Sequence, residues 1–394
     1  MEENTKIEIK DVSKIFGKNP KKVLKLLDEG LSKAEILERT GHNVGLYKLN
    51  FEIKSGEIFV IMGLSGSGKS TLLRCINRLI EPTTGEILID DDDVIKMKPE
   101  NLRELRRNKL GMVFQNFGLL PHRSVIDNVA YGLEVRGIEK EQRYEKALEA
   151  IENVGLKGHE NSDISELSGG MQQRVGLARA LATDPDILLM DEAFSALDPL
   201  IRSEMQDELL ALQDRMQKTI VFVSHDLDEA LKLGDRILLM NEGKAVQIGT
   251  AEEILTNPAD DYVAKFVAGV DRSKVLLAEA VMKRPDPVIS INSSLKVAVQ
   301  LMKKHGISSI YVVDRNKILK GFVTIDKAID GIKESKKIED VMGEDVHKTA
   351  PDTPLNELIP IIESHSPLAV VDEKDKLIGV VVRGSVLGAL AMED

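Results

Sequence analysis

The sequence predicts an α/β domain with a largely parallel sheet, followed by a smaller α+β module made of two repeats. Between residues 46 and 250, short apolar segments such as DILLMDEA and KTIVFVSHD alternate with longer helical segments, which is typical of parallel sheets. A glycine-rich pattern of the kind that binds phosphate follows one predicted strand. From about residue 275 the sequence contains an internal repeat of two copies, in which the segment 312–314 (VVD) returns as 370–372. A chain of 394 residues is too long for one compact core, so we expect at least two domains.

Composition indicates an ordinary globular chain with no membrane span of its own. The chain is 42% hydrophobic and 30% charged, and no apolar run is long enough to cross a bilayer. The charged N-terminal segment MEENTKIEIK predicts no secretory signal. The single cysteine, Cys75, allows no intramolecular disulfide and fits a reducing compartment. A net charge of -12 gives no general attraction to nucleic acid, so we expect no nucleic-acid partner.

A helical insert of about residues 19–41 is predicted directly after a strand at residues 7–16. Ser32 and Glu35 form the pattern of a capping box that begins a helix, and Gly41 is the expected stop. Part of the insert faintly resembles a DNA-binding helix-turn-helix, but it carries no arginine stripe. Pattern alone therefore leaves the role of the insert open.

The strongest chemical signal is the phosphate-binding pattern G-x-x-x-x-G-K-S between a strand and a helix. Its glycines let successive backbone N–H groups converge on phosphate oxygens, and the helix N-terminus favours an anion. We expect Lys69 to contact the β- and γ-phosphates and Ser70 to supply an oxygen ligand to Mg²⁺. ATP and Mg²⁺ are thus the expected cofactors. The ATP-binding residues expected here are Gly63, Leu64, Ser65, Gly66, Ser67, Gly68, Lys69, Ser70 and Thr71.

Two carboxylates end the apolar segment ILLM at residues 187–190. Asp191 is expected to hold Mg²⁺, directly or through water. Glu192 is expected to orient or activate the water that attacks the γ-phosphate. A phosphate-binding loop lies about 120 residues upstream, and this strengthens the interpretation of the two carboxylates as part of an ATP site.

A second anion-binding helix N-terminus is predicted in the same domain, at the segment LSGGMQQR of residues 167–174. One nucleotide does not need two such sites from one subunit. We therefore expect a head-to-tail dimer in which each ATP lies between the phosphate loop of one copy and this segment of a second copy. The residues expected to act on the partner's ATP are Ser168, Gly169, Gly170 and Met171.

The motifs and their order resemble the ABC ATPase family. In that family the fifth signature residue is usually Gln, where this chain has Met171, and the change touches a side chain rather than the backbone donors. The resemblance implies that Gln115 links the metal and the attacking water to the transport partner. It also implies that His225 touches the γ-phosphate and that Phe16 stacks on adenine. The helical subdomain is expected at about 116–180. The resemblance assigns a D-loop at the dimer seam to Ser195, Ala196, Leu197 and Asp198.

The C-terminal repeat resembles a tandem pair of CBS domains, which implies domains at 1–272, 273–335 and 336–394. Such pairs often bind an adenine nucleotide with a pattern that ends in Asp. Lys327 stands where the first Asp is expected, and Val382 and Ser385 replace Thr and Asp in the second copy. Cyclic di-AMP, an anionic lipid that contacts the module's lysines, and a scaffold without a nucleotide therefore remain open. The lysine-rich segments are residues 303–304, 315–320 and 333–337.

The insert, the phosphate loop MGLSGSGKSTLLRCINRLIEPTTGEI and the CBS pair together resemble the ATPase subunit of glycine betaine and other quaternary-amine importers, the ProV/OpuA type. The resemblance implies ATP hydrolysis that energises import, a peripheral location on the cytoplasmic face of the cell membrane, and regulation by ionic strength or a nucleotide. It implies integral membrane permease subunits and a fused or associated substrate-binding protein as partners. No Trp is present, so an aromatic cage for a quaternary amine must lie on another subunit. The alternatives are an ABC importer motor for another small solute and a non-transport ABC ATPase.

The loop at residues 117–122, FGLLPH, is apolar and contains Gly and Pro. Such a loop is either locally buried or a docking surface for a cytoplasmic helix of the permease. We expect the second.

Overall fold

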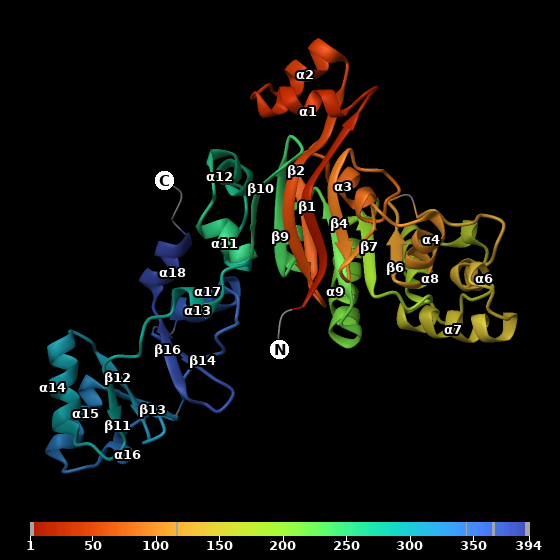
Figure 1. Cartoon of the computed structure of the whole chain (residues 1–394). Coiled ribbons are helices and arrows are strands. Elements are labelled where there is room, and N and C mark those ends of the chain that lie inside the picture. The colour runs from red at the N-terminus through yellow and green to blue at the C-terminus, as the bar shows by residue number, and fades with distance from the viewer. Residues whose placement is uncertain (1–3, 116, 344, 365–366, 391–394) are drawn as a thin grey trace. The chain divides into compact units, whose positions relative to one another are not determined.

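The chain divides into two compact units, Met1–Val267 and Ala268–Asp394 (Figure 1). Within the described ranges, no helix is long and apolar enough to span a membrane. Each unit has buried hydrophobic clusters of its own. The computed structural model of the protein describes residues 4–115, 117–343, 345–364 and 367–390.

The first unit contains a six-stranded sheet with the strand order β10-β9-β3-β8-β7-β6. Neighbouring strands pair in parallel from β9 to β6, and β10 pairs antiparallel with β9. Every residue of β3, β7 and β8 is buried, which explains their continuous apolar sequences. The strands are β3 (Ile58–Gly63), β6 (Leu110–Val113), β7 (Ile187–Asp191), β8 (Thr219–Ser224), β9 (Arg236–Asn241) and β10 (Lys244–Gly249).

An antiparallel sheet with the order β2-β1-β4-β5 packs against the parallel sheet. The contact includes the stacked rings of Phe51 and Phe59, with centroids 5.4 Å apart. The helix α3 (Lys69–Ile76) contributes Leu72, Leu73 and Ile76 to the same core. This packing holds the segment that begins α3 at the edge of both sheets. The antiparallel strands are β1 (Thr5–Phe16), β2 (Asn43–Lys54), β4 (Thr84–Ile89) and β5 (Asp92–Asp93).

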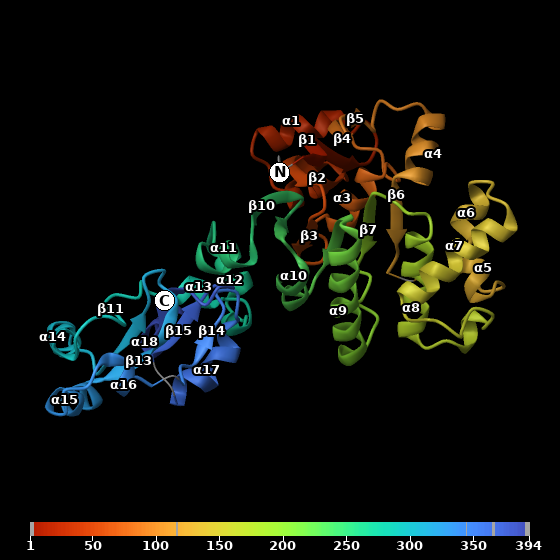
Figure 2. The same cartoon turned by 90° about the horizontal axis from the view of Figure 1, so that it is seen from below.

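Helices surround the sheets, and α5, α6 and α7 group beside α8 on the side of this unit away from β10 (Figures 1 and 2). Asn128 is fully buried there and donates from Nδ2 to the carbonyl oxygens of Leu120, Arg123 and Ser124, so it ties the preceding loop to α5. The helices are α4 (Pro99–Asn108), α5 (Val125–Val129), α6 (Tyr131–Val135), α7 (Lys140–Asn153), η1 (Ile164–Glu166), α8 (Gly169–Leu181), α9 (Pro199–Met216), α10 (Leu227–Leu233), α11 (Ala251–Thr256) and α12 (Asp261–Val267).

The insert between β1 and β2 forms two short helices, α1 (Lys21–Asp28) and α2 (Lys33–Thr40). The capping box expected between Ser32 and Glu35 is present, and Gly41 ends α2 with a left-handed φ of 71°. Val23, Leu27 and Ile36 bury their side chains against β1 and β2. The insert is therefore a packed part of the first unit.

The second unit contains two three-stranded sheets, β11-β12-β13 and β14-β15-β16, one in each sequence repeat. Both have the same pairing pattern, parallel between the first two strands and antiparallel between the last two. The elements are η2 (Arg272–Lys274), α13 (Ala278–Val281), β11 (Val288–Ser290), α14 (Leu295–His305), β12 (Ser309–Val313), β13 (Leu319–Thr324), α15 (Ile325–Lys333), α16 (Ile338–Val341), β14 (Lys348–Thr349), α17 (Leu355–Ser364), β15 (Leu368–Val371), β16 (Leu377–Val381) and α18 (Arg383–Leu390).

The two repeats exchange their first helices. Val281 of α13 packs with Leu368 and Val381 of the second repeat, whereas Ile338 of α16 packs with Val312 of the first repeat. The segments that follow these helices also pair across: Lys283 bridges to Val380, and Gly343 bridges to Phe322. Each core therefore crosses the division at residues 335–336 that the sequence repeat suggests.

Candidate functional site

Four loops of the first unit leave neighbouring strands at one edge of the parallel sheet. The register pairs Met62 with Ser224 and Asp191 with Val223. The residues that follow these strands, together with the end of β6, therefore lie side by side. They comprise the phosphate loop after β3, His225 after β8, Glu192 after β7 and Gln115 after β6. The carboxyl edge of a parallel sheet is where such folds bind ligands.

Close backbone approach requires glycine at two positions of the phosphate loop. A Cβ at Gly63, whose φ is 147°, would lie 2.2 Å from the carbonyl oxygen of Met240. A Cβ at Gly68, which precedes α3 with a φ of 109°, would lie 2.5 Å from the carbonyl oxygen of Gly45. These contacts hold the loop against β2 and β9 with its N–H groups at the start of a helix.

Lys69 is buried and folds back on the loop. Its Nζ donates to the carbonyl oxygen of Gly63 at 2.8 Å and to that of Leu64 at 3.3 Å. Burial lowers the pKa of Lys69, and the nearby carboxylates of Glu192 and Asp191 oppose that shift. Oγ of Ser67 is also buried and has no hydrogen-bond partner within the described residues. A desolvated ammonium and an unpaired hydroxyl in one loop fit an anion.

A cavity of about 650 Å³ opens beside the phosphate loop, within the usual size range of small-molecule sites. Of the predicted ATP-binding residues, Ser67 is the one that does not line it, because its side chain is buried within the loop. Phe16 stands at the cavity with 37% of its surface exposed. Three lining residues were not predicted, namely Lys33, Asn43 and Gly45. They come from the insert and β2, and no motif marks them.

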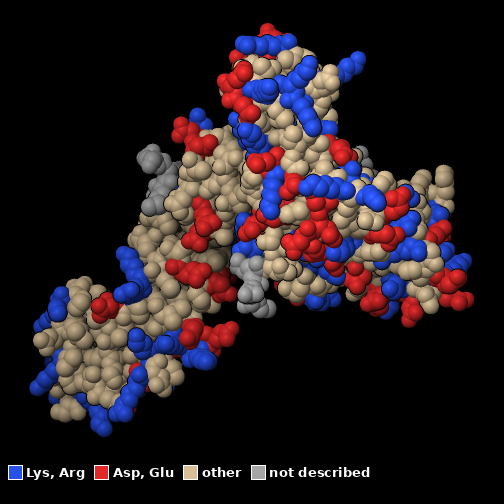
Figure 3. Space-filling view, viewed as in Figure 1, with Lys and Arg blue, Asp and Glu red and all other residues tan. Residues whose placement is uncertain are grey.

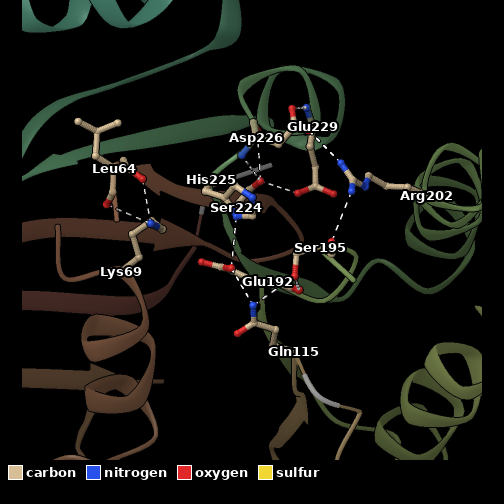
Figure 4. A network of polar contacts seen from close by, with 11 residues as sticks. Leu64, Lys69, Gln115, Glu192, Ser195, Arg202, Ser224, His225, Asp226 and Glu229 are labelled. Atoms are coloured by element: carbon tan, nitrogen blue, oxygen red, sulfur yellow. Dashed lines mark hydrogen bonds and ion pairs between the residues drawn. The ribbon is translucent and has the colours of Figure 1, made fainter. Parts of the chain in front are cut away.

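Two polar side chains at this edge contact the same carboxylate oxygen of Glu192 (Figure 4). Oε2 of Glu192 accepts from Nε2 of Gln115 at 3.1 Å and lies 3.3 Å from Nδ1 of His225. Nε2 of Gln115 also lies 3.4 Å from Oγ of Ser195, which donates to the carbonyl oxygen of Glu192 at 2.9 Å. Glu192 has a left-handed φ of 47°, so the chain turns out of β7 at this residue.

Asp191 has a partner that the sequence did not suggest. Its carboxylate is almost fully buried, and its Oδ2 lies 3.1 Å from Nη2 of Arg74 in α3. The sequence separation of 117 residues gave no local signal for this pair. Asp191, Ser70 and Gln115 together offer carboxylate, hydroxyl and amide oxygens, which is the hard donor set that Mg²⁺ prefers.

Arg202 of α9 connects the residues after β7 with those after β8 (Figure 4). Its Nη1 lies 3.2 Å from Oδ2 of Asp226, and its Nη2 donates to the carbonyl oxygen of Leu197 at 3.1 Å. Glu229 lies behind this pair, where it accepts hydrogen bonds from Ser224 and Gln206. Burial raises the pKa of Glu229. The predicted D-loop is thus tied to the segment that carries His225.

The segment of residues 168–171 does not line the cavity of its own chain. Oγ of Ser168 accepts from the backbone N–H of Met171 at 3.3 Å and caps α8. A Cβ at Gly170 would lie 2.7 Å from Cγ2 of Ile201, so this glycine permits close packing against α9. The side of the cavity opposite the phosphate loop is therefore not closed by these residues.

A second, apolar groove of about 380 Å³ lies beside β6 and α6. Gly118 and Leu120 of the predicted docking loop line it, together with the exposed side chains of Phe114, Tyr131 and Val135. Arg179 of α8 holds the loop by donating to the carbonyl oxygens of residues 117 and 118 at 2.9 and 2.6 Å.

Comparison with known proteins gives a family match for each of the two units. The profile described as ABC transporter matches residues 46–195, and the profile described as CBS domain matches residues 278–334 and 338–392. The chain is 54% identical over 391 residues to the glycine betaine transport ATP-binding protein OpuAA of Bacillus subtilis, with 99% of this chain and 93% of the relative covered. It is 51% identical to the glycine betaine/carnitine transport ATP-binding protein GbuA of Listeria monocytogenes and 48% identical to the glycine betaine/proline betaine transport system ATP-binding protein ProV of Escherichia coli. Both alignments cover 98% of each chain.

Among solved structures, the chain is similar to the dimeric structure of a post-hydrolysis state of the ATP-binding cassette MJ0796 bound to ADP and Pi. The sequences are 33% identical and the TM-score is 0.53. The match covers 62% of this chain and 98% of that chain. The likeness therefore extends over the fold of one complete cassette.

Proposed function

The chain belongs to the family of ABC transporter ATP-binding proteins, and on this premise we propose that it energises the import of glycine betaine or a related quaternary amine. The observation that carries the ATPase part is the convergence of Gln115 and His225 on Oε2 of Glu192, beside the phosphate loop. The names of the three relatives above support the substrate class.

The phosphate loop would bind the nucleotide through its backbone N–H groups and through Lys69. Lys69 donates to carbonyl oxygens of the loop itself. Phosphate oxygens are stronger acceptors for an ammonium than carbonyls are. On binding, the Lys69 ammonium would turn from Gly63 and Leu64 to the β- and γ-phosphates, and Phe16 would stack on the adenine.

Glu192 would accept a proton from the attacking water or orient it, because its Oε2 faces the cavity between Gln115 and His225. His225 would donate to the γ-phosphate and hold Glu192 in position. Gln115 comes from the loop next to the apolar groove. Binding of a partner in that groove would therefore change the position of Gln115 relative to Glu192.

Ser70, Gln115 and Asp191 would hold Mg²⁺. Their oxygen donors fit this cation, which supplies charge neutralisation for the phosphates when bound. Asp191 is held in place by Arg74, so its carboxylate is oriented before the metal arrives.

Two copies would close on two ATP molecules, with Ser168, Gly169, Gly170 and Met171 of each copy covering the cavity of the other. This arrangement is supported by the absence of residues 168–171 from the cavity of their own chain. The similar cassette MJ0796 was solved as a dimer. Residues 195–198 would then lie at the dimer seam, where Arg202 ties them to the segment of His225.

The apolar groove would receive a cytoplasmic helix of the permease. The chain would then be a peripheral protein on the cytoplasmic face of the membrane. Exposed aromatic side chains next to a loop that carries a catalytic residue suit such a contact. A substrate-binding protein, fused or separate, would complete the transporter.

The second unit would regulate transport. A cavity of about 480 Å³ within it is lined by Lys283 and Arg284 from one repeat and by Val380 and Val382 from the other, with Tyr311 in its wall. Asp286 also lines this cavity, so its two cations and one carboxylate leave a net positive charge that suits a nucleotide anion such as cyclic di-AMP. Lys and Arg side chains are also spread over the part of this unit that carries α14, α15 and α16 (Figure 3), which favours anionic lipid instead. Calorimetry with cyclic di-AMP and flotation with anionic vesicles would distinguish the two.

The deciding experiment is uptake by proteoliposomes that contain the chain together with the permease that copurifies with it. We expect ATP-dependent accumulation of labelled glycine betaine that unlabelled quaternary amines suppress. Accumulation of an unrelated solute would identify a motor for another small solute. Copurification of nucleic acid or ribosomes without a permease would identify a non-transport ABC ATPase.

A further inference from the structure

The insert between β1 and β2 reaches the cavity of the phosphate loop. Nζ of Lys33, the first residue of α2, donates to the carbonyl oxygen of Gly66 at 3.0 Å, and its side chain lines the same cavity as Lys69 and Ser70. We propose that Lys33 is a nucleotide-binding residue, an ammonium that the insert supplies to the phosphates of the nucleotide. The proposal rests on the function proposed above and adds one residue to its binding site.

The local structure of the insert places Lys33 at that point. The capping box between Ser32 and Glu35 sets the first turn of α2, so the direction in which the Lys33 side chain leaves the helix is determined. Ile36, one turn later on the same helix, is fully buried in the cluster with Val23 and Val44. Burial of Ile36 fixes the rotation of the helix and leaves its N-terminal end beside the phosphate loop.

Polar contacts hold the insert at its middle and join its two ends. Asp28, the last residue of α1, accepts from the hydroxyl of Tyr47 and from Nζ of Lys48 at 2.6 Å each. Nε2 of His42 lies 2.6 Å from the carbonyl oxygen of Lys18, and a Cβ at Gly17 would lie 2.3 Å from the His42 ring. The insert is thus fastened to β2 on one side and closed on itself on the other, as expected for an element that positions a side chain.

The charge environment of Lys33 suits binding of an anion. Burial lowers the pKa of Lys33, and the charge of the Glu242 carboxylate opposes this shift only in part. Within the described residues, Lys33 forms a hydrogen bond to a neutral carbonyl but no ion pair with a carboxylate. Lys69 is held in the same way by carbonyl oxygens of the same loop. An ammonium has three N–H donors, so Lys33 can keep Gly66 and still contact a phosphate.

A purely mechanical role is the competing explanation. Lys33 would then clamp the phosphate loop through Gly66, and its loss would weaken the ligands that contact this loop by a factor that does not depend on salt. A charge contact to phosphate predicts a different pattern, because salt screens the charge and the loss of affinity for phosphate-bearing ligands then shrinks as salt rises.

The test measures dissociation constants of the full-length chain for ATP, tripolyphosphate and adenosine by displacement of a fluorescent ATP analogue. For Lys33→Ala we expect about tenfold weaker binding of ATP and of tripolyphosphate at low salt, as for loss of one charge-assisted hydrogen bond. Adenosine binding should be unchanged, and Lys33→Arg should keep most of the ATP affinity. Lys22→Ala, on an exposed position of α1, is the matched control and should behave as the unaltered chain.

A loss of ATP affinity that is the same at low and high salt, equal weakening of all three ligands, or unchanged ATP binding would overturn the proposal. Melting of each variant without ligand shows whether the insert is still folded, and Lys33→Met supplies a second substitution that keeps the aliphatic stem. If the proposed function itself is wrong, the result is different. The unaltered chain would then bind no ATP, or Lys69→Ala would leave ATP binding intact.

Discussion

Nδ1 of His225 lies 3.3 Å from Oε2 of Glu192, although the two residues follow different strands of the parallel sheet. Nε2 of Gln115, after a third strand, donates to the same oxygen. Strand order places β6, β7 and β8 side by side, and register brings their ends level. Glu192 lies at the centre of this set. We therefore expect ATP hydrolysis to depend most strongly on the charge of its carboxylate.

Glu192→Gln should retain the shape of the side chain and the binding of ATP but remove the proton acceptor. We expect hydrolysis to fall by on the order of a hundredfold or more, while ATP-bound dimers accumulate. Phosphate release and size-exclusion chromatography in ATP measure the two effects. Glu204→Gln, on an exposed position of α9, should leave both unchanged. Normal turnover in Glu192→Gln would remove Glu192 from its assigned role.

Arg74→Ala should destabilise the first unit, because it leaves the buried Asp191 carboxylate without its ion-pair partner. Since the Arg74 side chain is about half exposed, we discount the cost for solvent and expect roughly 1–2 kcal/mol in urea unfolding. Arg103→Ala removes an exposed ion pair with Glu100 and an exposed hydrogen bond to the carbonyl oxygen of Pro99, and it should have little effect. Equal stability of the two variants would contradict a structural role for the Arg74–Asp191 pair.

Arg202→Ala should slow hydrolysis while ATP affinity stays the same, because Arg202 contacts Asp226 and Leu197 but does not line the nucleotide cavity. We expect a loss of about tenfold, as for one charged hydrogen-bonding group. Arg202→Lys should restore only part, since one ammonium cannot form the forked contact. Arg215→Ala, exposed at the end of the same helix, is the control. A parallel loss of ATP affinity would show that Arg202 acts on binding instead.

Cys75 should make stability fall at alkaline pH. Burial raises the pKa of its thiol from 9.0 to about 12. Below pH 9 the thiol is protonated in both the folded and the unfolded chain and has no effect on the pH dependence. Between pH 9 and 12 only the unfolded chain releases the proton, so the free energy of unfolding decreases as pH rises. Urea unfolding at pH 8 and pH 10 should show a smaller decrease in Cys75→Ala than in the unaltered chain. Identical pH dependence would mean that Cys75 titrates normally when folded.

Ile338→Ala should loosen the first repeat although Ile338 belongs to the second. Ile338 is fully buried in the cluster with Val312 and Met302, so the substitution leaves a cavity that costs about 2–5 kcal/mol. Hydrogen exchange should show faster exchange in β12 and α14. Ile329→Ala, at a position of α15 that is 37% exposed, serves as control. A loss confined to β15 and β16 would contradict the exchange of helices between the repeats.

Local patterns in the sequence sufficed for much of the site. The phosphate loop is readable because converging N–H groups demand glycines at set positions before a helix. The carboxylates of residues 191 and 192 are readable because they end an apolar strand. The alternation of strands and helices predicted the parallel sheet, and the capping box predicted the start of α2.

Other features required the tertiary structure. Lys33 meets Gly66, Arg74 meets Asp191 and Arg202 meets Asp226 only because the strand order and the seating of the insert bring distant segments together. Neither the period of a helix nor that of a strand carries this information.

The sequence by itself determined that the chain has a phosphate-binding α/β domain and a two-copy module, because glycine spacing, apolar periodicity and repetition are properties of neighbouring residues. Only the tertiary structure decided that the insert faces the nucleotide cavity and that α13 and α16 change places between the repeats. Both outcomes depend on which apolar faces bury one another. That choice is made by packing over the whole unit and leaves no mark in any local segment.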